Sequence, residues 1–291
     1  MILIDALLSG VTLGGMYALI AMGLTLQYGV ARIMNLSYGE FLIAAAFLAF
    51  WFFTGLGVNP PAGLLLVVPL AFLVNWAIYR ALLTWLVARA KTRAALEVDS
   101  ILATFGLLFV IQGIALVAFG GAYYSYSYLA VPVSVLGSTI AANRLVALAA
   151  AAVIGGGLYL VMTRTRLGTA LRAVAVDPVA AQLVAIDIRA AAAFAFALGG
   201  GLVAAGGVLV SMFLTFSATM GVLFTMKALI VVIMGGVGNL MGCLVAGLLL
   251  GLAETLVSRF VDPGLTLAAT FTLFLGILLW RPAGLFGKAA R

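Results

Sequence analysis

Few side chains in this sequence could take part in chemistry. The 291 residues include eight Asp or Glu, fifteen Lys or Arg, no His and one Cys, Cys243, which lies inside an apolar stretch. We therefore expect no disulfide within the chain, no metal site and no catalytic residue. A membrane enzyme would need a His, a Cys/His site or a cluster of carboxylates, and the sequence has none of these patterns.

One polar segment interrupts two strongly apolar runs near the N-terminus. It reads Met34-Asn-Leu-Ser-Tyr-Gly-Glu-Phe41 and contains Asn35, Ser37 and Glu40. In one interpretation it is an ordinary loop, with Ser37 as the N-cap of a helix and Glu40 as its N3 partner. In the other it is a structured turn at the cytoplasmic mouth of a pathway, because polar backbone near membrane depth is tolerated where it lines a cavity.

A cluster of glycines marks a second unusual segment. Gly235, Gly236 and Gly238 are followed by Asn239, and no Gly-Lys-Ser/Thr sequence follows to make a phosphate loop. We predict a break or tight turn that Asn239 could cap. The later small-xxx-small spacings, such as Gly247 to Gly251, predict close packing of helices.

Lys227 and Glu254 are charged residues inside apolar runs. A Lys at mid-bilayer costs roughly 2.5–3.5 kcal/mol on insertion scales. Either Lys227 extends to the outer interface, or the two residues form an ion pair or face a pathway at a subunit interface.

The composition indicates which elements must position these groups. Apolar residues make up 66% of the chain and charged residues 8%. The charged fraction is too low for a soluble globular protein, and the apolar fraction is too high for a disordered chain. We predict an all-α polytopic membrane protein with about 8–9 transmembrane or re-entrant helices, forming a single transmembrane domain over residues 1–291. The nine apolar segments are 5–31, 36–54, 61–79, 99–119, 141–162, 190–213, 221–237, 240–256 and 265–280, of which 221–237 and 240–256 are either two spans or a re-entrant pair.

The basic residues predict the orientation. Twelve of the fifteen fall on one side if both the C-terminus and the segment 163–189 are cytoplasmic and the N-terminus is outside. These twelve are Arg32, Arg80, Arg89, Lys91, Arg93, Arg164, Arg166, Arg172, Arg189, Arg281, Lys288 and Arg291. The net charge of +7 is therefore interpreted as a topology signal and not as a sign of nucleic-acid binding.

The segment 163–189 is the longest cytoplasmic connection in this scheme. Leu167, Leu171 and Val174 recur at helical spacing, and Asp177-Pro178 gives an N-cap followed by a first-turn proline. We predict a short amphipathic helical element, which either rests on anionic lipid or docks in a groove of another protein.

Several blocks, spread over nearly the whole chain, resemble LivH-type permease subunits of branched-chain amino acid ABC importers. The run Gly23-Leu-Thr-Leu-Gln-Tyr-Gly to Asn35-Leu-Ser-Tyr-Gly-Glu40 is similar to the family's N-terminal signature, with Tyr38 where the family often has His. Residues 165–187 resemble its coupling segment, with Ala185 where Gly is usual. The Lys227 to Gly238 block, Glu254 and the ending Arg281-Pro-Ala-Gly-Leu-Phe-Gly also match.

The resemblance implies a transport subunit of the bacterial cytoplasmic (inner) membrane. By position in the motif, the residues that couple to the ATPase would be Gly168, Arg172, Asp177, Ala180 and Ala181. The implied partners are a second related permease, two cytosolic ATPase subunits that use ATP and Mg²⁺, a periplasmic or extracellular binding protein, and membrane lipid. No cofactor is expected on this chain, which has no Walker motif.

The alternative is a self-sufficient secondary transporter or channel for small polar solutes. It would need ionisable groups at the midplane to couple transport to an ion gradient, and only Lys227 and Glu254 are available. The substrate stays open among branched-chain and other amino acids, amides and urea.

Overall fold

The computed structural model describes residues 2–89, 92–135 and 138–287, so Lys91, Lys288 and Arg291 lie outside the described residues. Within these ranges the chain is a bundle of helices with one short hairpin, β1 (Pro132–Val135) paired antiparallel with β2 (Ser138–Ala141). The helical elements are α1 (Ile2–Leu26), η1 (Gln27–Ala31), α2 (Tyr38–Leu56), α3 (Pro60–Ile78), η2 (Tyr79–Leu83), α4 (Thr84–Arg89), α5 (Arg93–Phe119), α6 (Ala142–Arg164), α7 (Arg166–Val176), α8 (Pro178–Leu183), α9 (Ile188–Ser211), α10 (Gly221–Gly235), α11 (Leu240–Phe260), η3 (Pro263–Leu265) and α12 (Thr266–Trp280).

The predicted class and helix number are confirmed. Eight helices in the described part of the chain are long and apolar enough to cross a membrane, and α10 is a further apolar helix of 15 residues. Helix α1 continues directly into the π-helical turn η1, so Leu3–Ala31 is one candidate span.

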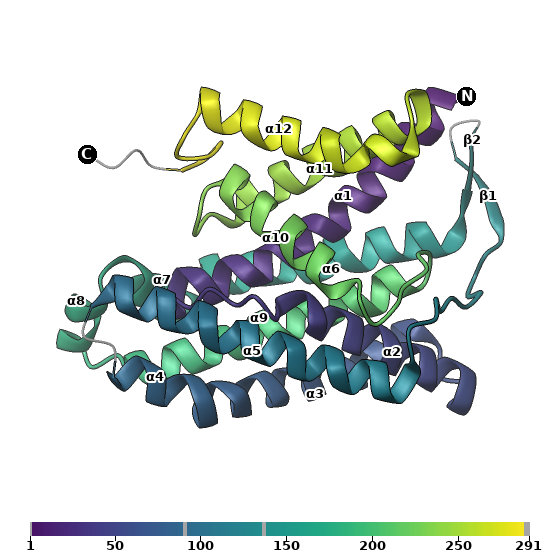
Figure 1. Ribbon diagram of the computed structural model, residues 1–291. Helices are drawn as coiled ribbons and strands as arrows, with labels where there is room; N and C mark the ends of the chain where they lie inside the picture. The colour runs from purple at the N-terminus through teal and green to yellow at the C-terminus, as the bar shows by residue number, and fades with distance from the viewer. Residues whose placement is uncertain (1, 90–91, 136–137, 288–291) are drawn as a thin grey trace.

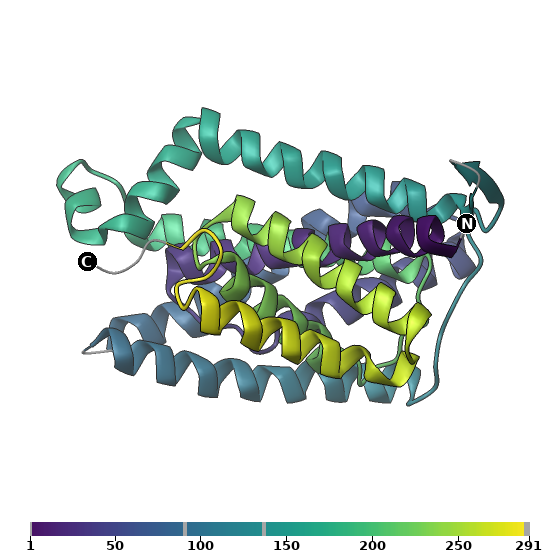
Figure 2. The same cartoon turned by 90° about the horizontal axis from the view of Figure 1, so that it is seen from above.

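Helix α9 lies at the centre of the bundle, against α1, α2 and α3 (Figures 1 and 2). It is rich in Ala and Gly, so neighbouring backbones can approach closely. An added Cβ at Gly207 would overlap the Leu42 carbonyl of α2, and one at Gly200 would overlap the Asn75 side chain of α3. The small residues of α9 thus allow three helices to pack on it.

Helices α1 and α11 pack closely through small residues. A Cβ added to Gly14 would lie 2.7 Å from Leu248 Cα, and one added to Gly247 would lie 2.6 Å from Ala18 N. The packing role predicted for the Gly247 to Gly251 spacing is therefore confirmed, and it operates within this chain.

The two ends of the bundle differ in what they carry. Helix α4, the α7–α8 segment and the end of α12 gather at one end, and the start of α1 and the β1–β2 hairpin lie at the other (Figure 1). The basic segments that the sequence analysis assigned to one side of the membrane thus share one end of the molecule.

Candidate functional site

Lys227 of α10 and Glu254 of α11 form an ion pair, as one interpretation of the sequence predicted. Lys227 Nζ donates to Glu254 Oε2 at 2.8 Å, and the exposed fractions of the two side chains are 19% and 4%. Tyr17 of α1 joins the pair, since its hydroxyl accepts from Lys227 at 2.6 Å and donates to Glu254 Oε2 at 2.8 Å. Thr270 of α12 donates to Glu254 Oε1 at 2.6 Å. Four helices are thereby joined by one buried polar cluster.

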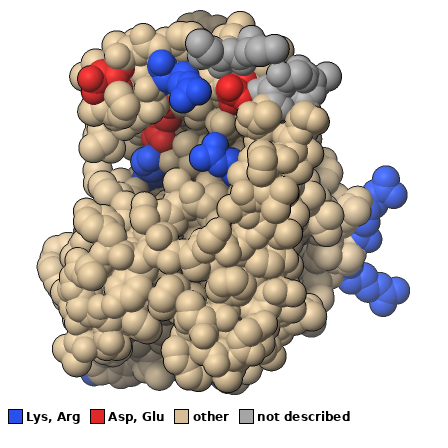
Figure 3. Space-filling view, turned by 90° about the vertical axis from the view of Figure 1, so that its right-hand side faces the viewer, with Lys and Arg blue, Asp and Glu red and all other residues tan. Residues whose placement is uncertain are grey.

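This polar cluster borders a cavity of about 320 Å³. Ser9, Thr12, Arg144, Lys227 and Glu254 are among its lining residues. Figure 3 shows the hairpin end of the molecule, where acidic and basic side chains gather around a hollow in an otherwise largely uncharged surface.

The segment 33–37 is a structured loop held by neighbouring helices. Met34 N donates to Ser100 Oγ of α5 at 3.3 Å, and Leu36 N donates to Thr104 Oγ1 of the same helix at 3.1 Å. Asn35 Nδ2 donates to Gln27 Oε1 at 3.1 Å. These polar side chains are all buried, so the loop backbone is satisfied by protein groups at this depth.

The predicted capping box at the start of α2 is wrong. Ser37 precedes the helix, but its side chain makes no cap bond and instead donates to Asn35 Oδ1 at 2.7 Å. The Gly39 backbone N–H donates to Thr225 Oγ1 of α10 at 2.8 Å. A local partner and a distant one thus replace the bonds that the S-x-x-E spacing suggested.

Glu40 lies buried beside α10. It is 1% exposed, and its Oε1 has no hydrogen-bond partner among the described residues. A Cβ added to Gly221 would overlap the Glu40 carboxylate, so the glycine at the start of α10 makes room for the side chain. Glu40 and the Lys227–Glu254 pair therefore contact different parts of α10.

The glycine cluster forms the tight turn between α10 and α11. Gly236 and Gly238 have φ angles of +96° and +84°, which side chains rarely adopt. Asn239 Oδ1 accepts from Gly242 N at 3.0 Å and so caps α11, as predicted. The chain after α12 closes over this turn, since Leu285 N donates to Met234 O at 2.7 Å and Phe286 N donates to Gly235 O at 3.2 Å.

The short helical element predicted for the segment 163–189 consists of two helices, α7 and α8. Asp177 Oδ1 caps α8 by accepting from Val179 N and Ala180 N at 2.9 and 3.1 Å. Gly168 is buried where α7 meets α6, and a Cβ there would overlap the carbonyls of Val161 and Met162. Arg172 and Ala180 are exposed, whereas Ala181 is 2% exposed.

Three large apolar side chains are exposed on α8 and at its C-cap, beside the exposed Gln182. Val179, Leu183 and Val184 have exposed fractions of 70%, 84% and 68%. Arg32, just before the loop 33–37, connects this loop to α7: its backbone is left-handed (φ 57°), and its Nη2 donates to the Ala175 carbonyl near the end of α7.

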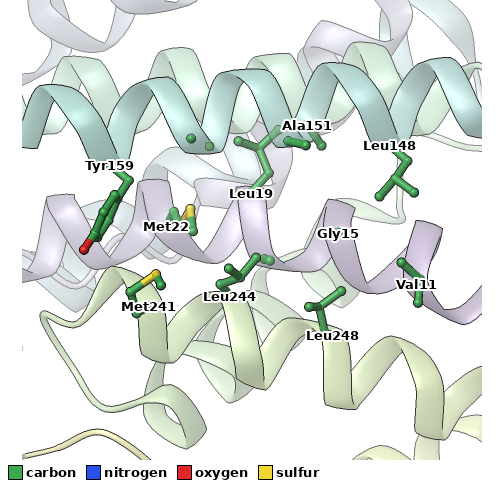
Figure 4. A pocket seen from close by; sticks show the side chains of 14 residues that line it. Val11, Gly15, Leu19, Met22, Leu148, Ala151, Tyr159, Met241, Leu244 and Leu248 are labelled. Carbon is green, nitrogen blue, oxygen red and sulfur yellow. The ribbon is translucent and has the colours of Figure 1, made fainter.

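A largely apolar groove runs along α1 between α6 and α11 (Figure 4). Its volume is about 360 Å³, and Leu19, Met22, Leu148 and Leu244 line it. Tyr159 and Met241 also line a second cavity of about 330 Å³, which reaches Arg172. The two cavities therefore adjoin along one side of α1.

Aromatic side chains close the bundle near the hairpin end. Phe47 of α2 stacks on Phe119 with ring centroids 4.1 Å apart, and Tyr124 pairs with Phe216 through two backbone hydrogen bonds. Burial raises the pKa of Tyr126 to about 12, and its hydroxyl lies 2.8 Å from Ser211 Oγ.

Comparison with known proteins places the chain in a family. Residues 6–280 match the family model described as the permease component of branched-chain amino acid transport systems. The chain belongs to this permease family.

Named relatives of this family member align over almost its full length. It is 26% identical over 300 residues to the high-affinity branched-chain amino acid transport system permease protein LivH of Escherichia coli K12, covering 98% of this chain and 96% of the relative. BraD of Pseudomonas aeruginosa is 26% identical over 299 residues with the same coverage. A solved structure of PsaBC from Streptococcus pneumoniae with Fab gives a TM-score of 0.48 at 12% identity, covering 98% and 92% of the two chains, which is too distant to bear on function.

The structure adds site residues that the sequence analysis did not single out. Tyr17, Arg144 and Thr270 join or border the polar cluster, and Gln27 holds Asn35. A signal was present for Arg144, since it is one of the three basic residues outside the twelve that the predicted orientation places on the cytoplasmic side.

Proposed function

We propose that this family member is the membrane-spanning subunit of an ATP-driven importer that passes branched-chain or related amino acids across the bacterial cytoplasmic membrane. The match of the family model to residues 6–280 carries the proposal, together with the substrate class in the relatives' names. The partners would be a second permease subunit, two ATPase subunits that bind ATP and Mg²⁺, and an external binding protein.

The α7–α8 segment is the proposed contact with the ATPase. Its exposed apolar side chains stand beside Arg172 and Asp177, and its location at the basic end fits a cytoplasmic surface. In this proposal Gly168 fixes the angle between α6 and α7, Asp177 fixes the start of α8, and Ala180 and Ala181 form the contact helix.

The proposed pathway groups lie in the loop 33–37, on α2, α10 and α11, and in the turn between α10 and α11. Asn35, Ser37 and Glu40 form the loop and helix start that contact α10, and Lys227 and Glu254 join α10 to α11. Gly235, Gly236 and Gly238 form the turn between these two helices. A movement of α7 would be transmitted to these pathway groups through the Arg32–Ala175 hydrogen bond and the loop that follows Arg32.

The test is transport by the assembled complex. We expect the chain to co-purify with two ATPase subunits and Arg172→Glu to lower substrate-stimulated ATPase activity and uptake at least tenfold. Arg281→Glu is the matched control, because Arg281 lies at the same end but outside the α7–α8 segment. Uptake by this chain alone in liposomes, driven by an ion gradient, would instead support a secondary transporter.

A further inference from the structure

The cavity beside the polar cluster has more positive than negative charge. Arg144 and Lys227 are its two basic lining residues, and Glu254 is its acidic one. Leu13, Phe213 and Leu214 give it an apolar wall. Its volume of about 320 Å³ lies at the small end of the range for ligand pockets, roughly 300–1,000 Å³.

Glu254 has little capacity left to bind a cation. Its Oε2 accepts from Lys227 and Tyr17, and its Oε1 accepts from Thr270. Lys227 donates to Tyr17 and Glu254, which leaves one of its three N–H groups. The Glu254 carboxylate therefore uses three of its about four acceptor positions, and the Lys227 ammonium retains one N–H donor.

Arg144 at the start of α6 supplies more unused N–H donors than Lys227 does. Its Nη1 donates to Ser9 Oγ at 3.0 Å, and its guanidinium carbon lies 5.9 Å from the centre of the Phe213 ring. No salt bridge to Arg144 is found within the described ranges. A guanidinium has five N–H donors in a planar fork that matches a carboxylate.

Resting on the proposed function, we propose that this cavity binds the carboxylate of a small amino acid through Arg144. The apolar wall then receives the aliphatic side chain of the amino acid, and the spare Lys227 N–H adds to the positive field at the carboxylate. Arg144 is in this case a binding residue, whereas Tyr17 and Thr270 position the Lys227–Glu254 pair.

Binding is measured on the purified full-length chain in nanodiscs of phosphatidylcholine, by saturation-transfer difference NMR with millimolar L-leucine. We expect a leucine signal that isovalerate, which keeps the carboxylate, reduces by competition. We expect leucinol, which lacks the carboxylate, to bind at least tenfold more weakly. Equal binding of leucine and leucinol by the wild-type chain overturns the proposal without any variant.

Two substitutions localise the site. Arg144→Met should weaken leucine binding about tenfold, and Arg144→Lys should restore part of it. Arg259→Met is the matched control, since Arg259 lies near the end of α11 but does not line the cavity, and should bind like the wild type. Equal loss in both Met variants, or no loss in Arg144→Met, overturns the proposal.

A phospholipid phosphate could bind the same N–H donors of Arg144 and Lys227, so lipid binding at this cavity is tested directly. In nanodiscs containing phosphatidylglycerol, native mass spectrometry counts bound lipid on the wild type and on Arg144→Met. Arg144-dependent lipid retention, with no leucine signal in either lipid composition, overturns the amino acid assignment. The assembled transporter is assayed separately, so a failure of this site with ATP-driven uptake intact leaves the proposed function standing.

Discussion

Removing one partner of the buried ion pair should lower the free energy of unfolding more than removing both. In Lys227→Met the Glu254 carboxylate keeps its bonds from Tyr17 and Thr270 but loses its only cation among the described residues. Breaking a buried pair in this way typically costs 3–5 kcal/mol. Because Lys227 is 19% exposed and water can replace part of its interaction, we expect the free energy of unfolding to fall by about 3 kcal/mol.

The double variant Lys227→Met/Glu254→Gln separates the ion pair from the rest of the cluster. The amide oxygen of Gln can still accept from Tyr17 or Thr270 and carries no charge, so we expect the double variant to lie within about 1 kcal/mol of the wild type. Stability is measured by denaturant unfolding in mild detergent, with the exposed Arg259→Met on the same helix as control. A Lys227→Met chain as stable as the wild type, or a double variant that shows the sum of two losses, would refute the reasoning.

Three further substitutions test positions where the packing is specific. Gly168→Val should separate α7 from α6 and lower uptake by the assembled complex, whereas Gly157→Val on the open side of α6 should not, and equal uptake by both would contradict this. Ala185→Gly should stabilise the chain by up to about 1 kcal/mol in denaturant unfolding, because Ala185 has a φ of +61°; a loss of stability would contradict it. Thr104→Val removes the acceptor for Leu36 N and the donor to Met34 O, and should lower the melting temperature more than Thr163→Val, whose hydroxyl is exposed.

The bundle could be predicted largely from composition and from where the basic residues lie. The apolar run 36–54 corresponds to α2 at Tyr38–Leu56, and 240–256 lies within α11 at Leu240–Phe260. The turn after Gly235 was predicted because glycines that close together break a helix, and its left-handed φ angles confirm the reason. These helices and this turn depend on neighbouring residues in the chain, so the amino-acid sequence alone predicts them.

The partners of the site residues could not be predicted, because they come from distant helices. Tyr17 is 237 residues away from Glu254, and Thr225 is 186 residues away from Gly39. The capping box failed because a local residue, Asn35, and a distant one, Thr225, offered Ser37 and Gly39 partners that the S-x-x-E spacing does not contain. Long-range contacts thus decided the chemistry of the segments that local pattern had located.

Glu40 gives the sharpest contrast between an ATP-driven importer and an ion-coupled transporter. It is a buried carboxylate, and among the described residues no salt bridge to it is found and its Oε1 accepts no hydrogen bond. A proton-coupled transporter would use such a group to carry the proton, so Glu40→Gln would abolish its uptake. In the ATP-driven importer the energy comes from the partner subunits, and Gln fits the same space beside Gly221. We therefore expect ATP-driven leucine uptake in proteoliposomes to stay within about threefold of the wild type and to be unaffected by a proton gradient; abolished uptake that tracks the gradient would favour the secondary transporter.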